Sequence, residues 1–154
     1  MKLNFDTTGY SVRVIETYNL FSEITEKLII LLSGLDKEQW ELPTCYPSWK
    51  VKDIAAHLIQ TSISRLSIQR DGYSGSVSLN GKTSFQDLSA FIDEANSSWS
   101  DTFSAISPRV LLDIIKVAER QLADFIQTQD IHSKAPYPVS WAGESVSENW
   151  FDLV

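Results

Sequence analysis

The sequence predicts an all-α protein, an up-down-up-down bundle of four helices with a long second connection that has room for an additional helix. Two observations support this fold class. Apolar residues recur at every third and fourth position over several long segments, and residues that start or stop helices flank those segments. The alternating pattern of a strand is confined to residues 76–79, a stretch too short to anchor a sheet.

The first helix is expected over residues 12–32. Its apolar residues follow the helical spacing: Ile15, Tyr18, Phe21, Ile24, Leu28, Leu31 and Leu32. Gly34 comes where many helices end in a left-handed residue, so it is predicted to be the C-terminal cap. Asp36 then opens a short turn toward Trp40.

The second helix is expected to run from Ser48 to about Arg70. Pro47 disfavours helical conformation just before it, and the Ser48 hydroxyl can accept a hydrogen bond as the N-cap. The apolar stripe of this helix consists of Val51, Ile54, Ala55, Leu58, Ile59, Ser62 and Leu66. His57 lies at the flank of the stripe, on a helix whose other face is polar.

Two further helices have recognisable start signals. Ser84 and Asp87 resemble a capping box, and Ser107 followed by Pro108 places a serine at the N-cap and a proline at the first helical position. The first of these helices is expected to bury Phe85, Leu88, Phe91, Ile92, Ala95, Trp99 and Phe103. The second, to about residue 127, is expected to bury Val110, Leu111, Ile114, Ile115, Val117, Ala118, Leu122, Phe125 and Ile126.

After a loop over residues 130–143, a last helix is expected to begin at a capping box of Ser145 and Glu148. Residues 146–154 make only about two and a half turns, too few for a helix that is stable alone. We therefore expect a longer protein whose last helix is truncated here, or a partner that completes the missing layer. A short terminal helix docked on the others is the alternative.

Composition predicts one globular domain over residues 1–154, because the chain is long enough for one core and short for two. The net charge is −7 at pH 7, and lysine and arginine gather in no patch, which argues against nucleic acid and anionic membranes as partners. No apolar run approaches a membrane span, and the N-terminus lacks an apolar signal region. With Cys45 as the single cysteine, a cytoplasmic location is expected.

Trp49 at a helix start, followed by Val-Lys-Asp-Ile-Ala-Ala-His-Leu over residues 51–58, resembles the DinB-like superfamily. It most resembles the metal-binding N-terminal domain of mycothiol-dependent maleylpyruvate isomerases, with a weaker likeness over residues 141–151. The resemblance implies a DinB-like bundle that binds a divalent metal, commonly zinc, through three histidines. His57 matches the first of these ligands, whereas the other two family ligands lie on the last helix, past the point where this sequence stops.

Each candidate residue also has a purely structural interpretation. His57 can be a neutral imidazole packed between helices, and Asp53, one turn earlier, can orient it or simply favour the helix start. His132 is expected to be a solvated loop histidine, and Cys45 a packed small hydrophobe. Trp49 and Trp141 are expected to cover the bundle ends, and Glu144 to lie near the site mouth or to lead the last helix.

Two functions follow. The first is a metal- and thiol-dependent isomerase or transferase, in which a metal on His57 activates a low-molecular-weight thiol toward a small-molecule substrate. The second is a non-catalytic bundle that serves dimerisation or small-molecule binding. A homodimer is compatible with both, and no catalytic residue is assigned. No phosphate-binding loop or nucleophile elbow is present, so phosphoryl transfer and serine hydrolysis lack support.

Overall fold

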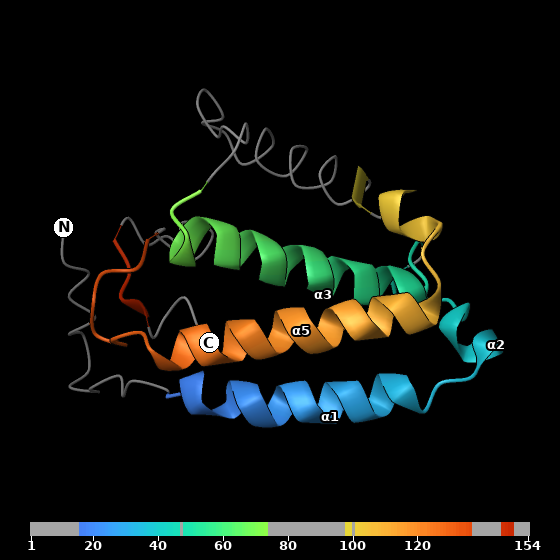
Figure 1. Cartoon of the computed structure of the whole chain (residues 1–154), viewed down its shortest axis with the longest axis horizontal. Coiled ribbons are helices and arrows are strands. Elements are labelled where there is room, and N and C mark those ends of the chain that lie inside the picture. Colours follow the sequence, from blue (N-terminus) through green and yellow to red (C-terminus); the bar gives the residue numbers. More distant parts are fainter. Residues whose placement is uncertain (1–15, 47, 74–97, 100, 137–145, 150–154) are drawn as a thin grey trace, which may run out of the picture. The chain divides into compact units, whose positions relative to one another are not determined.

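The computed structural model describes residues 16–46, 48–73, 98–99, 101–136 and 146–149. In order, its elements are the 3-10 turn η1 (Tyr18–Leu20), the helices α1 (Phe21–Ser33), α2 (Lys37–Trp40) and α3 (Val51–Arg65), the π-helical turn η2 (Leu66–Arg70), and α5 (Pro108–Gln127) (Figure 1). The described residues contain no strand, only two isolated bridges, and the predicted all-α class is confirmed.

The chain forms two compact units. One comprises residues 20–128, and the other comprises residues 1–19 together with residues 129–154. The long helices that the structure describes, α1, α3 and α5, belong to the first unit. The single domain expected for residues 1–154 stays a prediction.

Within residues 20–128, α5 lies between α1 and α3 and packs against both (Figure 1). It is antiparallel to α1, because hydrogen bonds join Ser22 to Gln127 and Glu26 to Arg120. The early residues of one helix thus meet the late residues of the other. In an up-down-up-down bundle the first and fourth helices are antiparallel, as α1 and α5 are here.

By contrast, α3 is parallel to α5. The Ser62 hydroxyl donates to Glu119, and the Arg70 guanidinium donates to Gln121. The later residue of the first segment thus contacts the later residue of α5, as in parallel helices. Parallel neighbours cannot be joined by a short turn, and residues 71–107 separate them. The described part of the predicted third helix is helical at residues 98–99 and 101–104, and its earlier residues lie outside the described ranges.

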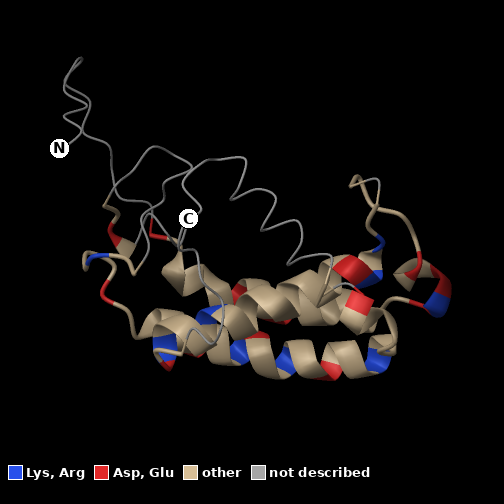
Figure 2. Cartoon of the chain, turned by 90° about the horizontal axis from the view of Figure 1, so that it is seen from above, with Lys and Arg blue, Asp and Glu red and all other residues tan. Residues whose placement is uncertain are grey.

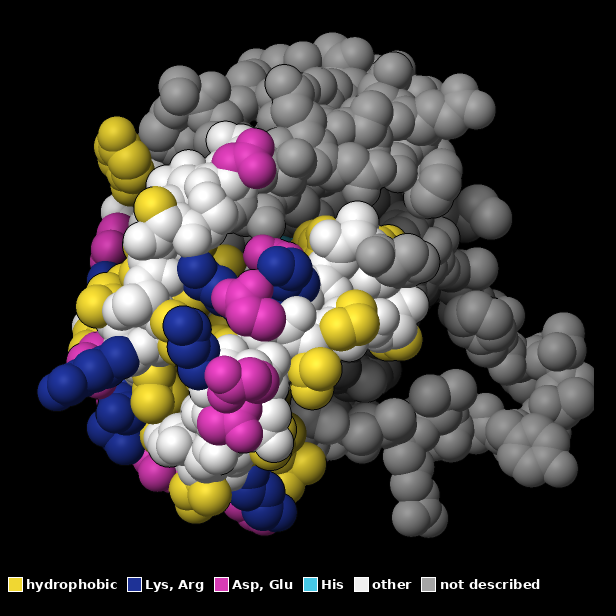
Figure 3. Space-filling model, turned by 90° about the vertical axis from the view of Figure 1, so that its right-hand side faces the viewer, with side chains coloured by type: hydrophobic (Ala, Val, Ile, Leu, Met, Phe, Trp, Pro, Cys, Tyr) yellow, Lys and Arg dark blue, Asp and Glu magenta, His cyan; other side chains and the backbone are white. Residues whose placement is uncertain are grey.

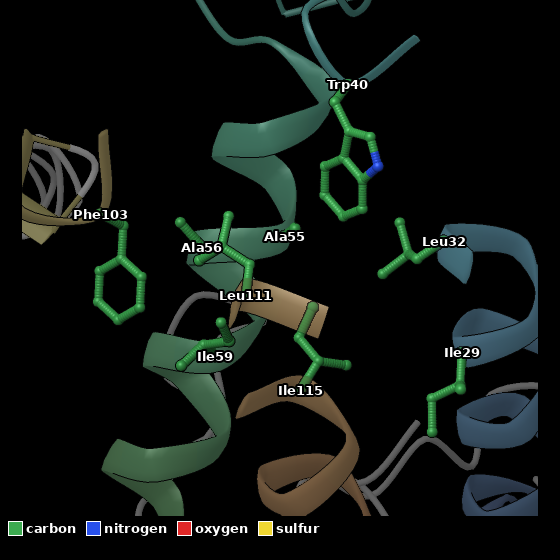
Figure 4. Packing of buried hydrophobic residues seen from close by; sticks show 9 residues of the cluster. All are labelled: Ile29, Leu32, Trp40, Ala55, Ala56, Ile59, Phe103, Leu111 and Ile115. Atoms are coloured by element: carbon green, nitrogen blue, oxygen red, sulfur yellow. The ribbon is translucent and has the colours of Figure 1, made fainter. Parts of the chain in front are cut away.

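The hydrophobic core joins residues of α1, α2, α3 and α5 (Figure 4). Leu111, Ile115 and Ile59 are fully buried at its centre. Trp40, the last residue of α2, lies at one end of the core. Phe103 enters from the segment before α5, with its ring stacked on Trp99 at a centroid distance of 5.3 Å. The remaining members of the cluster are Ile29, Leu32, Ala55 and Ala56.

The predicted face of the first helix is wrong in part. Ile24 and Leu31, expected in the apolar face, are 58% and 63% exposed, whereas Thr25 and Ile29 are buried. On α5, the expected core residues Val110 and Val117 are likewise exposed. These helices carry more apolar residues than one packed face requires, so spacing alone does not tell which of them face a neighbour.

Gly34 closes α1, but not as predicted. Its φ is −86°, in the right-handed region, and its N–H donates to the carbonyls of Ile30 and Leu31 at 3.2 and 3.1 Å. A left-handed residue is unnecessary, because the chain passes directly into α2. There Asp36 and Gln39 form a reciprocal capping box, with both side chain to backbone distances at 2.8 Å.

The expected N-cap Ser48 is also wrong. The cap of α3 is Lys50, whose N–H donates to Oδ2 of Asp53 at 2.9 Å. An antiparallel bridge between Pro43 and Lys50 holds the preceding turn, with Val51 N–H donating to the Leu42 carbonyl at 3.0 Å. This pairing fixes the start of the helix two residues later than the sequence suggests.

The predicted start of α5 is confirmed. Ser107 is extended, Pro108 is the first helical residue, and the Ser107 hydroxyl oxygen accepts from the Val110 N–H at 3.4 Å. The serine thus satisfies one of the backbone donors that every helix leaves open at its N-terminus.

In the second unit, the described residues 129–136 and 146–148 form loop, turn and bridge, and Asn149 is helical. Lys134 and Glu148 are bridge partners, and the Ala135 N–H donates to the Ser147 carbonyl at 2.8 Å. The side chain of Asn149 donates to the Asp130 carbonyl at 2.7 Å. Ser145 and residues 150–154 of the expected last helix lie outside the described residues.

Charged side chains of both signs are interspersed along the helices (Figure 2), and at the end of the first unit that carries α2 they alternate with apolar ones (Figure 3). This distribution fits an acidic chain with no basic patch. Among the described helices, none is both long and apolar enough to cross a lipid bilayer.

Candidate functional site

His57 lies in the middle of α3 and is half-buried. Its ring meets Trp49 edge-on at a centroid distance of 5.2 Å, and its Nδ1 lies 3.2 Å from Oε1 of Gln60. It stands two residues from both Ala55 and Ile59, which are buried. At 100° a residue, His57 therefore lies on the side of α3 opposite the stripe that packs on α5.

Asp53, proposed as an acceptor for the imidazole, holds the start of α3 through the Lys50 N–H. Lys50 in turn forms an ion pair with Glu41 at 2.8 Å, and this pairing lowers the pKa of the Glu41 carboxyl. The structural interpretation of Asp53, an acidic residue that stabilises a helix N-terminus, is thus supported.

His132 is an exposed loop residue, as predicted. Its N–H donates to Oδ1 of Asp130 at 3.0 Å, and its Nδ1 lies 3.5 Å from Oε2 of Glu148. Hydrogen bonds from the His132 backbone and from the Ser133 hydroxyl lower the pKa of Asp130. Cys45 is exposed, which corrects the expectation of a packed thiol: the bridge between Pro43 and Lys50 leaves it on the outside of the turn.

The described tryptophans differ in how far they are buried. Trp40 is buried in the core, and Trp49 is half-buried between Tyr46 and His57. Trp141 and Glu144, placed near the site by the sequence, lie outside the described residues, as does Trp150.

The donor side chains that the structure describes do not by themselves form a zinc site. Such a site needs three protein ligands or more, and no group of three His, Cys, Asp or Glu side chains that could hold a metal is found among the described residues. Both histidines of the sequence and its one cysteine are described. Among the residues that the structure describes, no ligand set is therefore found around His57.

A partly buried polar pair joins α3 to α5. The Ser62 hydroxyl, in a side chain only 2% exposed, donates to Oε1 of Glu119 at 2.5 Å. Burial raises the pKa of the Glu119 carboxyl, and the hydrogen bond from Ser62 opposes part of that rise. Ser62 was expected in the apolar stripe of the second helix, and Glu119 was not predicted. The sequence does place Glu119 four residues after Ile115 and three before Leu122, and therefore on the same face of the helix as these buried residues.

A groove of about 520 Å³ lies between the C-terminal half of α3, η2 and α5. Its apolar lining is formed by Ile63, Leu66, Val110, Ile114, Val117 and Ala118. Polar side chains also line it: Ser67, Arg70, Asp113 and Gln121. The volume falls within the range of about 300–1,000 Å³ that is usual for small-molecule sites.

Residues 21–72 match the family model of the mycothiol maleylpyruvate isomerase N-terminal domain. The predicted resemblance is confirmed over these residues. The match covers about a third of the chain and runs from the start of α1 past the end of η2, so it includes His57. None of the curated proteins and none of the solved structures matches the chain.

The family match covers the α3 side of the groove but not its α5 side. The segment resembling the mycothiol maleylpyruvate isomerase domain supplies His57 and the α3 side of the groove. The α5 side, with Val110, Ile114 and Val117, and the half-buried Glu119 lie after the matched residues. The family match therefore gives no information on the α5 side of the groove.

Proposed function

We propose that this DinB-like, mycothiol maleylpyruvate isomerase-related bundle binds a small, uncharged and mainly apolar molecule in the groove between α3 and α5. The observation that carries the proposal is the groove itself, because it is large enough for such a ligand and its apolar side chains come from both helices. The exposed side chains of Val110 and Val117 also support the proposal. An apolar ligand in the groove would remove their apolar surface from water, which favours binding.

The charges beside the groove favour a neutral ligand. Nε and Nη2 of Arg70 donate to the two carboxylate oxygens of Asp71 at 2.7 and 2.9 Å, and Nη1 donates to Oε1 of Gln121 at 2.8 Å. Asp113 is paired with Lys116 at 3.3 Å. Because each charge already has an opposite partner, an ionic ligand would have to compete with an existing pair, whereas an uncharged one would not.

Binding of the uncharged, solvatochromic dye Nile red tests this function. The wild-type chain should bind it with saturable blue-shifted fluorescence, and Val117→Glu should weaken the binding about tenfold or more, because it places a charge against an apolar ligand. Val117 is exposed, so the variant should keep its fold.

The matched control is Ile30→Glu, at an exposed position of α1 that does not line the groove. It should bind the dye as the wild type does. The proposal is contradicted if the wild type shows no saturable binding or if both variants bind equally well.

A divalent metal bound through His57, with a low-molecular-weight thiol for isomerase or transferase chemistry, is the second candidate. It is favoured by the family match, which includes His57. Further ligands would have to come from outside the described donors. Metal analysis of the purified chain should then find zinc in the wild type and a loss of that metal in His57→Ala, with circular dichroism to check the fold. A wild type without metal would eliminate this candidate.

A further inference from the structure

We propose that the ligand of the groove between α3 and α5 is a linear, uncharged hydrocarbon chain with an oxygen atom at one end, as in a medium-chain primary alcohol. This ligand class rests on the proposed function and adds to it the shape of the ligand and its direction in the groove. It is supported by the length of the groove, by its width, and by a polar bridge at one end.

The groove runs along the helix axes. The lining residues of α5 recur at every third or fourth position from Val110 to Gln121, so they lie along one side of that helix. At the helical rise, these two residues are about 16 Å apart along the axis. The lining residues of α3 and η2, from Ile63 to Arg70, have the same spacing, and the two helices are parallel. An elongated ligand can therefore contact both sides of the groove over much of its length.

The groove is also narrow. Spread over this length, its volume of about 520 Å³ corresponds to a mean cross-section of about 30 Å². Such a cross-section takes one extended hydrocarbon chain but not two side by side. Leu66 and Ala118, each 5% exposed, lie at the bottom of the groove, and the exposed Val117 lies at its edge. A linear chain is thus covered by both helices, whereas a second branch would stay in water.

Arg70 and Gln121 form a polar bridge at one end of the groove. Each is the last lining residue of its segment, and the hydrogen bond from Nη1 of Arg70 to Oε1 of Gln121 joins η2 to α5. The amide nitrogen of Gln121 carries two N–H donors, which have no hydrogen-bond partner among the described residues. A hydroxyl or carbonyl oxygen can accept from them without displacing Arg70. The oxygen of the ligand is therefore assigned to this end, and its chain extends toward Val110.

Displacement of Nile red from the full chain by alcohols tests the shape of the ligand. The straight-chain primary alcohols hexanol, octanol and decanol should displace the dye at successively lower concentrations, by a factor of about four for each added methylene. The branched isomer 2-butyl-1-hexanol has the formula of decanol but the width of two chains. It should need a concentration about tenfold higher or more, because one branch is left in water.

Gln121→Met tests the position of the oxygen, because methionine has a similar size and no N–H donor. The variant should bind decanol about threefold to tenfold more weakly, the range for one hydrogen bond between uncharged groups. The gain per methylene should stay unchanged, since the chain contacts other residues. Gln69→Met is the matched control, because Gln69 belongs to η2 but does not line the groove. It should bind decanol as the wild type does, and circular dichroism checks the fold of both variants.

The outcomes separate this ligand class from the proposed function. A wild type without saturable Nile red binding would contradict both. Saturable dye binding with equal displacement by decanol and its branched isomer would overturn the ligand class and leave the proposed function standing. The same holds if Gln121→Met and Gln69→Met bind decanol equally well.

Discussion

Ile115→Ala is expected to lower the free energy of unfolding by about 2–5 kcal/mol, the range for large-to-small substitutions at buried sites. Ile115 is 0% exposed and lies in the core cluster with Leu111 and Ile59 (Figure 4). Because α5 packs against both α1 and α3, a cavity here removes contacts within the central layer. Urea denaturation followed by circular dichroism at 222 nm measures the change.

The same substitution at an exposed position provides the control. Ile30 is 70% exposed on α1, so Ile30→Ala should change the free energy of unfolding by less than about 0.5 kcal/mol. Comparable losses at both positions would show that Ile115 is not at the centre of the core.

Glu119→Gln is expected to raise the free energy of unfolding at pH 7, by less than about 1 kcal/mol because the carboxylate keeps partial access to water. Burial raises the pKa of Glu119, so the folded state disfavours the charged form. The glutamine oxygen can still accept the hydrogen bond from Ser62. Urea denaturation at a series of pH values measures the difference between variant and wild type.

The sign of the pH dependence follows from the raised pKa. The folded state holds the proton of Glu119 more tightly than the unfolded state, whose pKa is near 4.5. The contribution of this group to stability is therefore complete below the unfolded pKa and declines as the pH rises through the folded pKa. The advantage of Glu119→Gln should accordingly vanish at acidic pH.

Asp124→Asn, at an exposed acid of the same helix, should show no such advantage at pH 7. If Glu119→Gln instead destabilises the protein at pH 7 and Asp124→Asn does not, Glu119 gains more from its charge than burial takes away. The interpretation of Glu119 as an acid whose charged form is disfavoured by burial would then be wrong.

The candidate site was only partly predictable. His57 stands out in the sequence because a motif surrounds it, and the family match includes it. Its surroundings could not be read from the motif, since Trp49 reaches the ring through the turn that precedes α3. Glu119 and Ser62 are 57 positions apart, and their contact exists only because α3 and α5 are parallel. The groove depends on the same packing.

The sequence by itself determined the helical class and the start of α5, because Ser107 and Pro108 act on backbone groups within the first turn. Only the tertiary structure decided that α3 begins after Lys50, where a bridge holds the preceding turn, and that Ile24 and Leu31 are exposed while Thr25 and Ile29 are buried. Capping is a local interaction that a few neighbouring residues specify. Burial depends on which helix lies opposite, and that choice is made by residues far along the chain.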